Sequence, residues 1–307
     1  MVLNEPIVVF RGVFVVLGED VSSTGIMKRI LTAVVLIALV GALIFFGKLW
    51  MITLAAAVVS VLAALEFRTF AEAGGCPIPL WWTIFAVALF FLATFYRPLD
   101  TITAVAFVTL VLFAVSAFTM ALEKVLWQTA VGLLMLVYIA FPLTLLPQIL
   151  TQENGTALLL FLCICVWSGD IAALYVGKRF GKRKFSPRLS PNKTWEGAVA
   201  SVFASCFFGM SLILLGDWFT QQNSSFTRLH TTEPWWVFLI LAAALNAAAQ
   251  FGDLLESALK RGAGVKDSGT MLPGHGGILD RIDALLVAAP VLWFVIAVRD
   301  YFSLGSL

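Results

Sequence analysis

The sequence predicts an all-α, polytopic integral membrane protein with about nine transmembrane helices and a cytoplasmic N-terminus. Of its 307 residues, 61% are apolar and only 12% are charged, whereas a soluble domain is nearer to half apolar and a quarter charged. The apolar residues also gather in stretches long enough for a helix to cross a bilayer. Finally, lysine and arginine collect in alternate connecting loops, which predicts an orientation.

The predicted spans are apolar stretches of about 20 residues each. They cover residues 29–46, 49–66, 80–96, 101–122, 125–148, 156–177, 197–217, 235–257 and 283–301. Residues 1–26 differ in character from the rest of the chain, and Met27 with the basic pair after it resembles a natural start. We therefore interpret residues 1–26 as an N-terminal extension or a mis-assigned start. Residues 27–150, with spans one to five, are expected to form a scaffold. Residues 151–307, with spans six to nine and two polar loops, are expected to form the catalytic region.

The distribution of basic residues predicts which loops face the cytoplasm. With the N-terminus inside, 15 lysines and arginines fall on the cytoplasmic side and 4 on the opposite side. An excess of basic residues in short loops is the usual mark of the cytoplasmic face. Both polar loops of the catalytic region are therefore expected to lie in the cytoplasm, where nucleotides are found.

The eighth span carries a stripe of polar residues. They are spaced at intervals of four, three, four and three residues: Asn246, Gln250, Asp253, Ser257 and Lys260. This spacing places them on one helical face. A polar face inside a membrane must meet protein or water, because lipid cannot satisfy it. We expect Asn246 and Gln250 to form hydrogen bonds between helices, and Asp253 to be functional.

Two aspartates, Asp280 and Asp283, lie three residues apart at the expected start of the ninth span. A single acid there would be ordinary compensation of the helix dipole. Two acids, with Asp253 just upstream of the same loop, favour a metal site. Oxygen ligands without clustered cysteine or histidine are typical of Mg²⁺. The predicted metal ligands are therefore Asp253, Asp280 and Asp283.

The loop between these acids offers partners for phosphate. Its cations can pair with phosphate oxygens, arginine in a bidentate manner and lysine as a point charge: Lys260, Arg261, Lys266 and Arg281. Gly276 and Gly277 lack side-chain bulk, so their N–H groups can approach a phosphate. His275 is a candidate donor to a phosphate or a leaving pyrophosphate, although a lone loop histidine is more often structural.

The loop from Lys178 to Gly197 is a second polar centre. Its basic residues have a simple interpretation as an orientation signal with affinity for anionic lipid headgroups. That interpretation does not explain the segment SPNKTWEG at 190–197, where we expect substrate-binding residues. Within this segment Lys193 is a candidate phosphate ligand, Thr194 a candidate cap of the next helix and Glu196 a further substrate-binding candidate. Asp170, an acid in the middle of the sixth span, is a functional candidate by default.

The run from Ser257 to Asp283, SALKRGAGVKDSGTMLPGHGGILDRID, resembles the signature of phosphatidate cytidylyltransferases, which are also called CDP-diacylglycerol synthases. The resemblance extends to the SPNKTWEG segment and covers residues 27–307. It implies a membrane enzyme that transfers CMP from CTP to phosphatidate and requires Mg²⁺. It further implies a site open to the cytoplasm in a bacterial inner membrane, and a homodimer as one form of assembly. Nucleic acid is not an expected partner.

The expected mechanism is an in-line attack of a phosphatidate oxygen on the α-phosphorus of CTP. The three metal-binding aspartates would hold the nucleotide phosphates, and the cations of both loops would surround pyrophosphate and the lipid headgroup. Because the nucleophile is already an anion at neutral pH, positioning and charge neutralisation carry the catalysis. Ser257 is a candidate for substrate binding. A covalent role for it is disfavoured, because no activating base lies near it in the sequence.

Two other functions are compatible with parts of the pattern. A CTP-dependent lipid kinase would use similar spans and the same nucleotide but would transfer the γ-phosphate. A transporter is the non-enzyme alternative, with Asp170 and Asp253 on an ion path, and it would need a polar route across the membrane. The concentration of polar residues at one face of the membrane favours chemistry on a lipid headgroup.

Overall fold

The computed structural model describes residues 23–96, 101–222, 229, 231, 233–265, 268–269 and 276–304. The helices are α2 (Ser23–Phe46), α3 (Leu49–Ala73), α4 (Leu80–Tyr96), α5 (Thr101–Thr119), α6 (Leu122–Met135), the π-helix η1 (Leu136–Ala140), α7 (Phe141–Leu150), α8 (Gly155–Phe180), α9 (Trp195–Gln222), α10 (Trp235–Gly262) and α11 (Leu279–Leu304). Two short strands, β1 (Lys184–Ser186) and β2 (Ser190–Thr194), complete the described elements. The all-α membrane fold is thereby confirmed.

Seven of the described helical segments are long and apolar enough to cross a membrane. They include the continuous segment Leu122–Leu150, which joins α6, η1 and α7. Two further apolar stretches, Val35–Phe46 and Leu80–Phe95, are shorter and coincide with the first and third predicted spans. The protein is therefore polytopic, while the count of nine spans and the cytoplasmic N-terminus stay predictions.

The π-turn of η1 has a local cause in the sequence. Pro142 has no N–H to donate to the carbonyl of Tyr138, and its ring would clash with that carbonyl in a regular α-helix. The chain relaxes by one residue, and the N–H of Phe141 bonds to the carbonyl of Leu136, five residues back. Such single π-turns within α-helices are frequent at functional sites.

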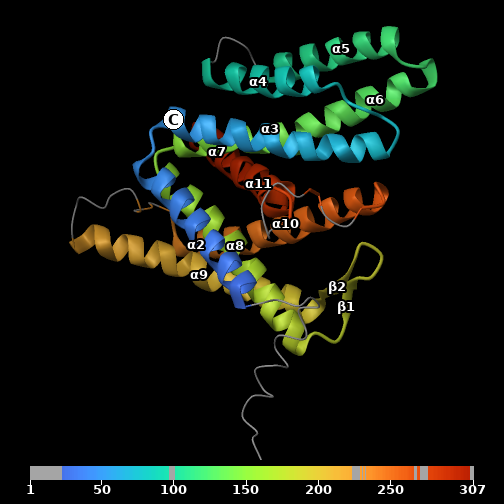
Figure 1. Ribbon diagram of the computed structural model, residues 1–307. Coiled ribbons are helices and arrows are strands. Elements are labelled where there is room, and N and C mark those ends of the chain that lie inside the picture. Colours follow the sequence, from blue (N-terminus) through green and yellow to red (C-terminus); the bar gives the residue numbers. More distant parts are fainter. Residues whose placement is uncertain are drawn as a thin grey trace, which may run out of the picture.

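The helices pack around two apolar cores, and both α7 and α11 contribute to each of them. One core lies among α3, α4, α5, η1 and α7, and the other among α7, α8, α10 and α11. Helix α11 supplies Leu279 and Leu286 to the first core, and Ala288 and Leu292 to the second. In Figure 1, α4, α5 and α6 lie at one side of the molecule and α8 and α9 at the other, with α3, α7 and α11 between them.

Small residues and the predicted polar stripe join α8, α9 and α10. A Cβ atom on Gly197 would come within 2.8 Å of the Ala173 carbonyl oxygen, so α8 and α9 cross closely, as small residues allow in membranes. Asn246 of α10 donates to the hydroxyls of Ser201 and Ser205 of α9, each at 2.8 Å. Gln250 donates to the Ala198 carbonyl at 3.1 Å and to Asn246 Oδ1 at 2.6 Å. The interhelical role predicted for Asn246 and Gln250 is confirmed.

The loop between α8 and α9 forms an antiparallel hairpin of β1 and β2, which was not predicted from the sequence. Thr194 caps α9 as predicted, because its Oγ1 accepts the N–H of Gly197 at 3.3 Å. Glu196 in the first turn of α9 accepts the backbone N–H groups of Lys182 and Arg183 at 3.1 and 3.2 Å. These contacts fix the hairpin to the start of α9, and β2 lies beside the end of α8 at Gly177 and beside Asp253 of α10.

Candidate active site

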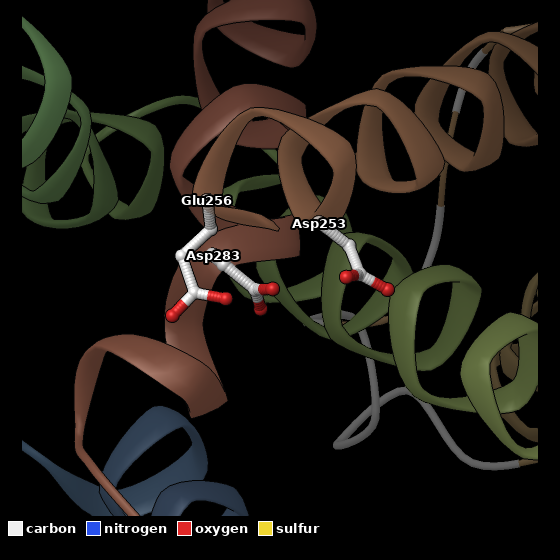
Figure 2. Close-up of side chains that lie close together, drawn as sticks. All are labelled: Asp253, Glu256 and Asp283. Atoms are coloured by element: carbon white, nitrogen blue, oxygen red, sulfur yellow. The ribbon is translucent and has the colours of Figure 1, made fainter. Parts of the chain in front are cut away.

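Three carboxylates converge where α10 passes the beginning of α11. Asp253 and Glu256 lie three residues apart on α10, and Asp283 faces them from α11 (Figure 2). One oxygen of each lies within 4.8 Å of the others. Gly252 permits this approach, because a Cβ atom there would collide with the backbone carbonyl of Asp283. We call Asp253, Glu256 and Asp283 the acid cluster.

The acid cluster is short of hydrogen-bond donors. Glu256 is 1% exposed and Asp283 is 8% exposed, yet Glu256 Oε1 is buried without a hydrogen-bond partner among the described residues. A buried carboxylate oxygen that lacks a partner is costly, and so is the mutual repulsion of three close acids. A divalent cation would relieve both, so the cluster fits a metal ion with oxygen ligands.

Asp280 has different surroundings. Its Oδ1 accepts from the Lys260 ammonium at 2.6 Å. Its Oδ2 accepts the N–H and the hydroxyl of Ser268 at 3.1 and 2.9 Å, and the N–H of Gly277 at 3.0 Å. Lys260 also pairs with Glu256 Oε2 at 2.5 Å. The lysine thus bridges Asp280 and the acid cluster. Of the predicted metal ligands the structure brings together Asp253 and Asp283, with Glu256 as the third member; a metal role for Asp280 stays a prediction.

A cavity of about 570 Å³ opens beside Asp253. It is lined by residues of α8, the hairpin, α9 and α10, including three lysines, and its polar lining residues are Asp170, Lys178, Lys184, Asn192, Lys193, Thr194, Gln250 and Asp253. Lys193 of β2 forms an ion pair with Asp253. At 38% exposure, the side chain of Asp253 is the most accessible of the acid cluster. The cavity and the cluster therefore meet at Asp253.

The other predicted site residues differ in their surroundings. Arg261 on α10 and Arg281 on α11 are exposed, and Ser257 is 9% exposed on α10. Gly276 has a φ of 82°, a conformation that disfavours any side chain. The N–H of Gly277 is engaged by Asp280. Lys266 and His275 lie outside the described residues.

Three residues that lie at or beside the site were not predicted from the sequence. Glu256 had a signal, since it lies three residues after Asp253, the same spacing as in the pair at 280 and 283. Glu66 of α3 accepts hydrogen bonds from Ser268 and from the first residues of α11; its signal was an acid at the end of an apolar span. The Tyr138 hydroxyl is buried without a hydrogen-bond partner among the described residues and interacts electrostatically with the acid cluster.

The sequence of the chain is similar to those of known proteins. A model of the family described as "Cytidylyltransferase family" matches residues 27–299, so residues 1–26 lie outside the match. A phosphatidate cytidylyltransferase of Haemophilus influenzae is 32% identical over 284 residues, which cover 86% of this chain and 96% of that protein. A phosphatidate cytidylyltransferase of Bacillus subtilis is 38% identical over 146 residues, 48% of this chain and 49% of that protein. Another, of Brucella suis, is 39% identical over 167 residues, 54% and 56% of the two chains.

Proposed function

The chain belongs to the cytidylyltransferase family, and from this membership we propose that it transfers CMP from CTP to phosphatidate, giving CDP-diacylglycerol and pyrophosphate. The names of its relatives support this reaction. The observation that carries it in the structure is the acid cluster, which meets a cavity lined by three lysines at Asp253. Such a site suits two phosphate-bearing substrates, one of which is held in the membrane.

Asp253, Glu256 and Asp283 would hold Mg²⁺. The cluster offers the hard oxygen ligands that this ion prefers, and the unpartnered oxygen of Glu256 supports its presence. When bound, Mg²⁺ supplies neutralisation of charge on the nucleotide phosphates and on the leaving pyrophosphate. Asp253, as the most exposed of the three carboxylates, would be the one nearest to the substrate.

The cavity lysines would bind the triphosphate of CTP. Lys184 belongs to β1, Lys193 to β2 and Lys178 to α8, and all three residues line the same cavity. Lys193 is paired with Asp253 in this structure. A phosphate that reaches the cavity would compete for that ammonium, which places phosphate beside the acid cluster. Asp170 lines the same cavity and would limit its positive charge.

Lys260, Arg261 and Arg281 would surround the headgroup of phosphatidate. Lys260 is held between Glu256 and Asp280, so its charge is fixed at the edge of the acid cluster. The attacking phosphatidate oxygen is an anion at neutral pH, so no general base has to take a proton. The new bond joins this oxygen to the α-phosphorus, and the bond to pyrophosphate breaks in line. The residues of the site contribute mainly by orientation and charge compensation.

The excess of basic residues in the loops that carry the site supports a cytoplasmic active site. Bacterial relatives support the inner membrane as its location. A homodimer is part of the proposal on the strength of the family resemblance alone. The lipid kinase is not favoured, because the relatives are named for cytidylyl transfer. Nor is the transporter, which would need a polar route through the whole bundle.

The test uses the purified chain in mixed micelles with phosphatidate, Mg²⁺ and CTP labelled at the α- or the γ-phosphate. Label from the α-phosphate in the lipid product, abolished by EDTA, is the expected result. Label from the γ-phosphate would instead establish a lipid kinase. If neither label reaches lipid while the protein stays folded, the proposed reaction is wrong.

A further inference from the structure

A carboxylate from the scaffold reaches the active-site loop. Glu66 of α3 is 2% exposed. It accepts the backbone N–H of Ile278 at 2.9 Å and that of Leu279 at 2.8 Å, and its Oε2 lies 3.0 Å from the Ser268 hydroxyl, whose single proton it shares with Asp280 Oδ2. These partners lie more than 200 residues away in the sequence. All three belong to the segment that leads into α11, the helix that carries Asp283.

Glu66 caps the N-terminus of α11. The first N–H groups of a helix have no partner within the helix and are usually satisfied by a nearby side chain of the same segment. Here a buried carboxylate of another helix accepts two of them, and its negative charge is favourable at the positive end of the helix dipole. The start of α11 is thereby fixed to α3.

The same carboxylate is linked to the acid cluster through a chain of contacts. The hydroxyl of Ser268 lies between Glu66 Oε2, at 3.0 Å, and Asp280 Oδ2, at 2.9 Å. Asp280 holds Lys260 at 2.6 Å, and Lys260 holds Glu256 at 2.5 Å. This contact chain therefore runs from the scaffold to a member of the acid cluster.

Two glycines of the loop are explained by the volume that Glu66 and Ser268 occupy. A Cβ atom on Gly269 would lie 2.6 Å from Glu66 Oε1, and one on Gly277 would collide with Ser268 Oγ and lie 2.5 Å from Glu66 Oε2. Real Cβ atoms do not approach that closely. The loop backbone is thus packed directly on the carboxylate, without an intervening side chain.

We propose that Glu66 is a positioning residue of the active site, which sets the start of α11 and, through Ser268 and Asp280, the place of Lys260 beside the acid cluster. This inference rests on the proposed function and deepens it. Glu66 would then act on the rate of CMP transfer without touching either substrate. A purely structural role would instead affect only the amount of folded protein.

The first test compares Glu66→Gln with the unaltered full chain in detergent. Glutamine keeps the size but loses the charge and one acceptor oxygen. We expect kcat for CMP transfer to fall about ten- to a hundredfold, as for a misplaced active-site group, with KM for CTP changed less than about threefold. Hydrogen exchange should rise in the first turn of α11. Glu72→Gln, on the exposed side of the same helix, is the matched control and should leave both readouts unchanged.

Ser268→Ala provides the second test, and the decisive one if Glu66→Gln does not fold. It keeps the bonds from Glu66 to the backbone of α11 and removes the link to Asp280, so we expect a smaller fall in kcat. In the double variant the combined fall should be less than the product of the two single falls, because both act through Asp280.

Two results would overturn the proposal: an unchanged kcat in Ser268→Ala, or a fall in Glu66→Gln that only tracks the folded fraction. Failure of the proposed function would look different, since the unaltered chain itself would then transfer no CMP.

Discussion

Asp280 and Asp283 lie one helical turn apart on α11, yet their surroundings are opposite. Asp280 accepts from a lysine, a hydroxyl and two backbone N–H groups. Asp283 accepts the N–H of its neighbour Ala284 and faces two further acids. A carboxylate that is already satisfied can hold other groups in place, whereas acids that face one another can bind a cation. Which of these two roles an aspartate can have depends on the groups around its side chain, and the three-residue spacing of Asp280 and Asp283 does not reveal it.

Removal of one charge from the acid cluster should have the largest effect. We expect Asp283→Asn to lower kcat on the order of a thousandfold, because it removes a metal ligand and the charge neutralisation that the metal supplies. The measurement is CMP transfer over a range of Mg²⁺ concentrations. Asp300→Asn, on the same helix, is the control and should keep full activity. Near-normal turnover by Asp283→Asn would remove this residue from the metal site.

Asp280→Asn should have a smaller effect of a different kind. The variant weakens the hold on Lys260 but leaves the acid cluster intact, so we expect kcat to fall about ten- to a hundredfold. The Mg²⁺ concentration for half-maximal activity should not change. A large rise in that concentration would show instead that Asp280 is a metal ligand, as the sequence predicts.

Replacement of Lys193, one of the three cavity lysines, should weaken the binding of substrate. We expect Lys193→Ala to raise KM for CTP about tenfold, the usual scale for one charge-assisted contact with phosphate, with its Mg²⁺ dependence unaltered. Lys182→Ala, from the same connection but not among the cavity residues, is the matched control. An unchanged KM for both CTP and phosphatidate in Lys193→Ala would exclude this lysine from the substrate site.

The smallest effect is expected from Asn246, a residue of the polar stripe on α10 that lies outside the acid cluster. Asn246→Ala removes two hydrogen bonds to α9 serines and the one accepted from Gln250, each worth little in a membrane because alternative partners exist there. We expect a loss of about 1 kcal/mol in the free energy of unfolding and a near-normal kcat. Thermal unfolding in detergent measures the change in stability, and an assay of CMP transfer on the same protein measures the change in kcat. A large loss of kcat at normal stability would move Asn246 into the active site.

The helices could be predicted from hydropathy, because a helix that crosses a membrane needs an apolar stretch of about 20 residues. Their ends were less predictable. Helix α10 ends at Gly262, beyond the predicted end at Ser257, and α11 begins at Leu279 rather than at Asp283. The hairpin of β1 and β2 was not predicted, because strands this short show no alternation of apolar and polar residues that can be recognised in the sequence.

The sequence predicted a group of acids at the candidate site but not all of its members. Acids and cations near 253–283 indicated a metal and phosphates. Which acids meet depends on the contact between α10 and α11 at Gly252, and a one-dimensional pattern does not contain that contact. Glu66 and Tyr138 come from spans that resemble plain scaffold, because a single sequence holds no measure of which distant segments touch.

The sharing of α11 between the two apolar cores has a consequence for any attempt to divide the protein. Residues 151–307, expressed alone, would carry all three acids of the cluster. They would also expose the face of α11 that holds Leu279 and Leu286 and would lack the carboxylate that caps this helix. Coexpression with residues 27–150 should restore both. The proposed active site would thus depend on both parts of the chain, and an exchange of one part should preserve activity only when its contacts with the other part are kept.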